Sequence, residues 1–137
     1  MTKIKIWALT LALLIISCSP KRRFQKICTG NYDVMNCLNV SFDSLINAPA
    51  KFEGKCIELD GYLNLQFEHV GFFKSKKKSY EAGAVWVTID DTIAKQIDKY
   101  YPNGLREKVS IKGVFNRTNK RFGFFGEVRQ ISCVEIR

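Results

Sequence analysis

The residues of this 137-residue chain best suited to chemistry are its five cysteines. Four of them form an even set, which in an exported protein predicts two disulfides with three possible connectivities. That set consists of Cys28, Cys37, Cys56 and Cys133. The favoured pairing joins Cys28 to Cys37 in a local loop and Cys56 to Cys133 across most of the folded domain, the second bond adding about 4 kcal/mol of stability. Crossed pairing stays open, because a sequence does not determine connectivity.

The fifth cysteine, Cys18, ends a segment with the features of an export signal. Lys3 and Lys5 precede an apolar run over residues 6–16, and a small residue follows that run. The run is too short for a transmembrane helix, which needs about 20 apolar residues. The motif Ile15-Ile16-Ser17-Cys18 resembles the lipobox of bacterial lipoproteins, in which the cysteine is acylated and becomes the mature N-terminus.

The lipobox resemblance implies a protein anchored to a membrane of the bacterial cell envelope. Residues 1–17 would be the removed signal. Stable membrane anchoring requires more than one acyl chain, and the lipidated Cys18 of a bacterial lipoprotein carries two or three. In enteric-type sorting, Asp directly after the acylated cysteine retains a lipoprotein in the inner membrane. Ser19 stands at that position here, which implies the outer membrane, with the protein facing the periplasm or the surface. The alternatives are an ordinary signal, or an uncleaved anchor with a buried Cys18 thiol.

The chain is strongly basic, with a formal net charge of +9. Loss of Lys3 and Lys5 with the signal leaves 20 basic and 13 acidic residues, or +7. Such a charge favours anionic partners: phospholipid headgroups, lipopolysaccharide phosphates, wall polymers or nucleic acid. Nucleic acid is not expected here, because the signal exports the protein.

Two basic clusters are the candidate ligand-binding residues. The first consists of Lys74, Lys76, Lys77 and Lys78, and the second of Arg117, Lys120 and Arg121. Aromatic residues interleave with these charges, namely Phe72, Phe73, Tyr80, Phe122, Phe124 and Phe125. Such mixtures hold single-stranded nucleic acid, lipid or lipopolysaccharide by stacking and by charge pairing. Strand alternation places half of these aromatics in the core, and the alternative is a pair of solvated basic loops.

Hydrophobic periodicity predicts the elements that position these residues. Period-two alternation predicts a long strand over residues 56–67 with Ile57, Leu59 and Leu63 on its inner face. Further strands are predicted over residues 70–74 and 84–90, over 108–116 with Ile111 and Phe115 inward, and from 122 onward, the last with a bulge. Ser41 is expected to cap a short helix that ends before Pro49, and Asp90 or Asp91 to cap a helix with Ile93 and Ile97 inward.

Two of the predicted strands each contain a glycine at the equivalent position. Residues 55–64 and 107–116 align without a gap at an offset of 52, which places Gly61 over Gly113. Glycine normally weakens a strand, so its presence at equivalent positions predicts a shared bend, as in a small closed barrel.

The element order is three strands, a helix and two strands, the order of the OB-fold, a five-stranded Greek-key barrel. The short first helix, Pro49 and the Gly54-Lys55 pair before the first long strand, together with Trp86, resemble small bacterial envelope lipoproteins with an OB-like barrel. The function of that group is mostly unassigned. We expect a mainly β protein with a signal over residues 1–17, a tether and disulfide-closed loop over 18–40, and the barrel over 41–137.

Motifs for catalysis or for metal binding are absent from the sequence. There is no GxSxG, HExxH, GxGxxG or Walker motif and no CxxC, and His69 is the only histidine. We therefore expect no catalytic residues, no metal and no cofactor. The favoured function is a lipid-anchored module that binds a partner protein or an anionic envelope polymer. The alternatives are a structural, accessory or exclusion-type lipoprotein without a ligand, and, last, an enzyme.

Overall fold

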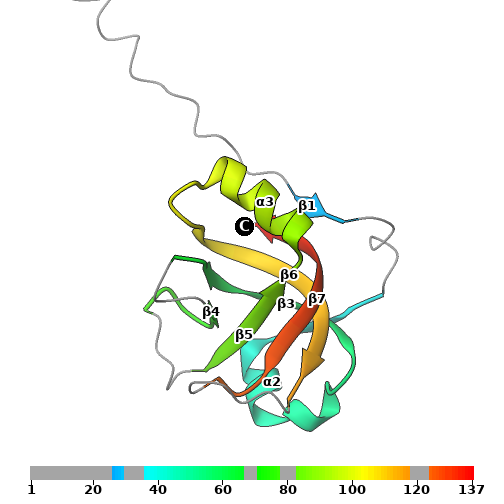
Figure 1. Cartoon of the computed structure of the whole chain (residues 1–137). Helices are drawn as coiled ribbons and strands as arrows, with labels where there is room; N and C mark the ends of the chain where they lie inside the picture. The colour runs from blue at the N-terminus through cyan, green and yellow to red at the C-terminus, as the bar shows by residue number, and fades with distance from the viewer. Residues whose placement is uncertain (1–25, 30–35, 67–70, 78–82, 118–123) are drawn as a thin grey trace, which may run out of the picture.

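The computed structural model describes residues 26–29, 36–66, 71–77, 83–117 and 124–137 (Figure 1). Its strands and helices in chain order are β1 (Ile27–Cys28), β2 (Leu38–Val40), α2 (Phe42–Asn47), the 3₁₀ helix η2 (Pro49–Lys51), β3 (Cys56–Asn64), β4 (Gly71–Phe73), β5 (Ala84–Ile89), α3 (Asp91–Tyr100), β6 (Arg106–Asn116) and β7 (Glu127–Ile136). The prediction of a mainly β protein is confirmed.

Five of the strands close into a barrel. β3 pairs with β6, β6 with β7, β5 with β4, and β4 with β3, all antiparallel, while β7 and β5 pair in parallel. β2 adds to the edge of β3 in parallel, and β1 adds to β7 antiparallel. Closure gives each barrel strand two partners, which removes the exposed edges of an open sheet.

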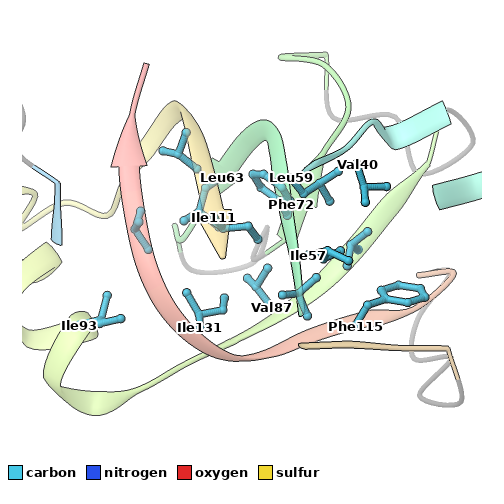
Figure 2. Close-up of a cluster of buried hydrophobic side chains, with 14 of the residues drawn as sticks. Val40, Ile57, Leu59, Leu63, Phe72, Val87, Ile93, Ile111, Phe115 and Ile131 are labelled. Atoms are coloured by element: carbon cyan, nitrogen blue, oxygen red, sulfur yellow. The ribbon is translucent and has the colours of Figure 1, made fainter. Parts of the chain in front are cut away.

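The barrel interior is filled by the alternating residues that the sequence singled out. Ile57, Leu59 and Leu63 of β3 are fully buried, as are Ile111 and Phe115 of β6. Figure 2 shows these side chains in one cluster with residues from β2, β4, β5, α3 and β7. β3 ends at Asn64, earlier than predicted, and Phe67 lies outside the described residues.

Gly61 and Gly113 both lie where a neighbouring strand comes close. A Cβ at Gly61 would lie 2.7 Å from the carbonyl oxygen of Phe73 in β4, and one at Gly113 would lie 2.8 Å from that of Arg129 in β7. The two glycines are not opposite each other, because Gly61 pairs with Val109. Each glycine therefore lets a neighbouring backbone come close: β4 approaches β3 at Gly61, and β7 approaches β6 at Gly113.

The predicted bulge in the last strand is confirmed. One residue separates Lys112 from Val114 in β6, whereas three separate their partners Cys133 and Arg129 in β7. Gln130, within the bulge, adopts a φ of 51°. The bulge lets Ile131 join the core although it has the opposite parity to Val128 and Val134.

Local caps define the two α-helices. The Ser41 hydroxyl accepts a hydrogen bond from the Ser44 backbone N–H at 3.1 Å, and the Asp90 carboxylate accepts one from that of Thr92 at 2.8 Å. α3 turns Ile93 and Ile97 into the core. α3 and α2 lie at opposite ends of the barrel (Figure 1).

The four cysteines form two disulfides, as predicted, but the favoured pairing is wrong. Cys28 bonds to Cys133, and Cys37 bonds to Cys56. The physical reason is strand register: Cys28 and Cys133 are direct partners in the β1–β7 pair. Cys37 and Cys56 each precede the first partners of the parallel β2–β3 pair, Leu38 and Ile57. Part of the expected tether and loop therefore belongs to the sheet.

The two disulfides should contribute differently to stability, because they close loops of different length. Their sequence separations are 105 and 19 residues. We expect Cys28→Ser/Cys133→Ser to lower the free energy of unfolding by about 4.7 kcal/mol and Cys37→Ser/Cys56→Ser by about 3 kcal/mol. Urea unfolding measures both losses. Cleavage at Met35 and at basic residues puts each cysteine on its own fragment, and recovery of linked Cys28 and Cys37 fragments would contradict the pairing.

The glycine positions predict a second effect on stability. Gly61→Ala and Gly113→Ala should each lower the free energy of unfolding by about 2 kcal/mol or more, because the added methyl meets backbone atoms of a neighbouring strand. Gly54→Asn is the control, since Gly54 has a φ of +70° and open space around it. Asn tolerates that conformation, so urea unfolding of this variant should stay close to wild type. Equal losses in all three variants would argue against close strand approach as the cause.

Candidate anionic-ligand surface

The first basic cluster follows β4. Lys74, Lys76 and Lys77 are exposed, and Lys78 lies outside the described residues. The Lys74 Nζ donates to the Asp43 Oδ1 at 2.6 Å, which ties this loop to the first turn of α2. An exposed ion pair of this kind contributes at most about 1 kcal/mol, so it orients the loop more than it stabilises the fold.

The second basic cluster follows β6. Arg117 is exposed, and its backbone N–H donates to the Glu53 Oε2 at 2.6 Å. The guanidinium does not make this bond, so the Arg117 charge can face a ligand while its backbone is held. Lys120 and Arg121 lie outside the described residues.

The fold brings the ends of the two loops together beside α2. The Phe125 N–H donates to the Ala84 carbonyl oxygen at 3.2 Å, so the chain entering β7 contacts the chain entering β5. A Cβ at Gly83 would lie 2.4 Å from Ile46 of α2 and 3.7 Å from the Phe125 ring. Both clusters therefore start or end against the α2–η2 segment.

We call this region the basic end. Its described cations are Lys51, Lys55, Lys74, Lys76, Lys77 and Arg117, and all six are exposed. The carboxylates of the same segments are those of Asp43 and Glu53. Six cations against two carboxylates give this end a local excess of positive charge, which raises the local concentration of anions.

The outer face of β3, β6 and β7 is different, because cations and carboxylates pair across it. The Glu58 carboxylate lies 3.7 Å from the Lys112 Nζ and 3.7 Å from the Arg137 guanidinium. The same guanidinium lies 3.9 Å from the Asp60 carboxylate and 3.8 Å from that of Glu135. These five side chains hold their charges in mutual contact, whereas at the basic end the described cations outnumber the carboxylates.

The aromatic residues near the basic clusters pack within the protein. Phe72 belongs to the barrel core, while Phe73 and Phe124 are buried in a second cluster with Ala84 and Trp86 on the outer face of β4 and β5. The Phe124 and Trp86 rings meet edge to face at a centroid distance of 5.3 Å. Tyr80 and Phe122 lie outside the described residues.

This aromatic cluster was not recognised in the sequence, although Ala84 and Trp86 have the parity of an outward face. It fixes the chain that leads from the second basic cluster into β7. Because Phe73 and Phe124 are buried, they do not offer open ring faces to bases, which argues against stacking of nucleic acid at these two positions.

Four polar residues of the described segments are buried, namely Asn64, Ser110, Glu127 and Ser132. The Ser110 hydroxyl donates to the Glu58 carboxylate and the Ser132 hydroxyl to the Lys112 carbonyl oxygen. Glu127 of β7 is 6% exposed and accepts a hydrogen bond from the Thr88 hydroxyl of β5. Asn64, at the end of β3, is 2% exposed; its Oδ1 accepts from the Gln66 N–H at 3.2 Å, while its Nδ2 has no partner. Glu68 and His69 lie outside the described residues.

One titratable group in the described segments has a resolved shift. Burial raises the pKa of Tyr101 above its usual value of 10.0, and the Glu107 carboxylate raises it further. The folded protein therefore keeps this proton in a range above pH 10 where the unfolded chain loses it, so stability falls as the pH rises through that range.

No group of three or more His, Cys, Asp or Glu side chains within the described segments is placed to hold a metal ion. In the same segments, no helix combines the length and the apolar character needed to cross a bilayer. No protein-family model, curated protein or solved structure matches the chain. The assignment of the basic end as a candidate site therefore rests on its own geometry and charge.

The aromatic cluster makes a prediction about the chain entering β7. Phe124→Ala should lower the free energy of unfolding by about 3 kcal/mol, because it removes a buried ring. Trp86 is the only tryptophan after residue 17, so its fluorescence should also shift to longer wavelength as the ring becomes solvated. Tyr100→Ala is the control, because Tyr100 is 46% exposed. Unchanged Trp86 fluorescence in Phe124→Ala would show that Phe124 does not cover Trp86.

Proposed function

We propose that this protein is a lipid-anchored module of the bacterial cell envelope that binds an anionic envelope polymer at its basic end. The observation that carries the proposal is the gathering, among the described residues, of six exposed cations and two exposed carboxylates at one end of the barrel. The paired charges of the β3–β6–β7 face supply the contrast within the same molecule.

The anchor is proposed from the residues that precede the fold. Residues 1–17 have the charge and apolar length of an export signal, and Cys18 follows in a lipobox-like motif. The disulfides between the other four cysteines support an oxidising compartment and leave Cys18 as the one cysteine available for acylation. Ser19 supports sorting to the outer membrane.

We further propose that the barrel is of the OB type, with a Greek-key order. The supporting observations are the cyclic strand order β3–β4–β5–β7–β6, the parallel β5–β7 pair and the position of α3 between β5 and β6. OB barrels bind ligands on the face of their second and third strands and with adjoining loops. Here Phe124 covers part of that face, which leaves the loops at the basic end as the proposed contact surface.

Binding to a polyanion tests this function. We would measure the affinity of the full-length acylated protein, in micelles of neutral detergent, for inorganic polyphosphate at several salt concentrations. Lys76→Ser/Lys77→Ser/Arg117→Ser should weaken binding about tenfold, since each lost charge contact is worth about 0.5 kcal/mol. Affinity of the wild type should also fall as salt rises.

The matched control is Lys95→Ser/Lys99→Ser/Lys108→Ser, which removes three exposed charges from the other end of the molecule. Its affinity for polyphosphate should stay within a factor of about two of wild type. Equal losses in both variants would show that net charge rather than the basic end causes binding. No binding by the wild type would favour the accessory or structural function without an anionic ligand.

A further inference from the structure

The chain enters the barrel at the end opposite the basic end. Ile27 pairs with Val134 and Cys28 with Cys133, close to the end of β7, and β1 also contacts α3. Asn116, which precedes Arg117, pairs instead with Glu127 at the start of β7. Figure 1 shows β1 and α3 at one end of the barrel and α2 at the other.

The separation of the two ends can be compared with the length of the tether. From Val134 to Glu127 is seven positions along β7, or roughly 20 Å at about 3.3 Å per residue when the bulge is allowed for. Cys18 and Ile27 are nine positions apart in the sequence. For a random-coil linker of nine residues the r.m.s. end-to-end distance is about 17 Å, and the fully extended limit is about 30 Å. Because Cys18 is joined to the barrel at the α3 end, the random-coil average places it nearer to that end than to the basic end.

Within the α3 end, helix α3 and the segment that leads into β6 carry no net charge, and the exposed Lys26 beside β1 adds one cation. Residues 90–108 carry four cations, at Lys95, Lys99, Arg106 and Lys108, and four carboxylates, at Asp90, Asp91, Asp98 and Glu107. The Tyr100 side chain is exposed at the end of α3, with the Lys99 Nζ 6.0 Å from its ring centroid. Tyrosine is enriched at membrane–water interfaces, where its ring and hydroxyl meet both environments.

We propose that the barrel stands on its membrane in one orientation, with the α3 end toward the bilayer that holds the acyl chains and the basic end away from it. The anionic partner is then an acidic polymer, bearing phosphate or carboxylate groups, that lies beyond that bilayer. The lipid headgroups of the anchoring bilayer are not the partner. This inference rests on the lipid anchor of the proposed function.

Two labelled variants of the full-length acylated protein test the orientation. Lys99→Cys places a thiol at the α3 end and Lys76→Cys places one at the basic end. Each is the single free thiol of its variant, because the sulfur of Cys18 carries lipid and the other four cysteines form disulfides. Both would be labelled with one fluorophore and reconstituted into phosphatidylcholine vesicles containing phosphatidylglycerol and a headgroup spin-labelled lipid. We expect the lipid quencher to remove most of the fluorescence at position 99 and to leave that at position 76 unchanged.

A longer tether supplies the matched control. Insertion of 20 Gly and Ser residues after Gln25 raises the mean reach to about 30 Å, which exceeds the distance between the two ends. The basic end should then reach the anionic bilayer, and quenching at position 76 should rise to at least the level at position 99. Without the insertion, equal quenching at both positions, or stronger quenching at position 76, would overturn the orientation.

The same vesicles separate this inference from the anchor. Acylated protein floats with the vesicles in a density gradient at high salt, whereas protein held by charge alone is released. Failure to float would refute the anchor and with it the orientation. Flotation together with quenching at position 76 would leave the anchor in place, refute the orientation and identify the headgroups as the anionic partner.

Discussion

The pairing of β3 with β6 is the interaction on which the rest of the structure depends. The two strands pair without interruption from Cys56 with Val114 to Asn64 with Arg106. Each strand then needs a further partner on its other edge, and Gly61 and Gly113 are where that partner comes within van der Waals distance. A side chain at either position would meet the carbonyl oxygen of Phe73 in β4 or of Arg129 in β7, so the two glycines favour closure of the barrel. The buried side chains of every barrel strand meet inside this closed sheet.

The N-terminal segment is held by the same sheet. β1 and β2 are too short to be stable strands by themselves, but each is joined by a disulfide to the barrel strand beside it. The Cys28–Cys133 bond also determines where the chain leaves the barrel toward its N-terminus. That position, at the end of β7 and beside α3, is far along the strand from Arg117. In the proposed orientation, the disulfide that joins β1 to β7 therefore also places the basic end away from the membrane.

The charges of the molecule are distributed in three different ways. On the outer face of β3, β6 and β7, three carboxylates lie close to Lys112 or Arg137. Over residues 90–108 they are balanced in number, and at the basic end the exposed cations of the described segments outnumber the exposed carboxylates threefold. Net charge alone therefore does not locate the proposed binding surface, because the positive excess of the described residues is local. The Phe73–Phe124–Trp86 cluster lies next to the basic end and holds the start of the chain that leads into β7.

Local chemistry by itself determined much of this protein. Alternation identified the inner residues of β3 and β6, the parity conflict in the last strand indicated its bulge, and the shared glycines indicated a closed sheet, because each signal lies within one strand. Only the tertiary structure decided which cysteines pair, because Cys28 and Cys133 meet through the register of strands more than 100 residues apart. It likewise decided that Asp43 and Glu53 hold the basic loops and that Phe124 packs on Trp86, since these contacts join segments distant in the chain and no local pattern encodes them.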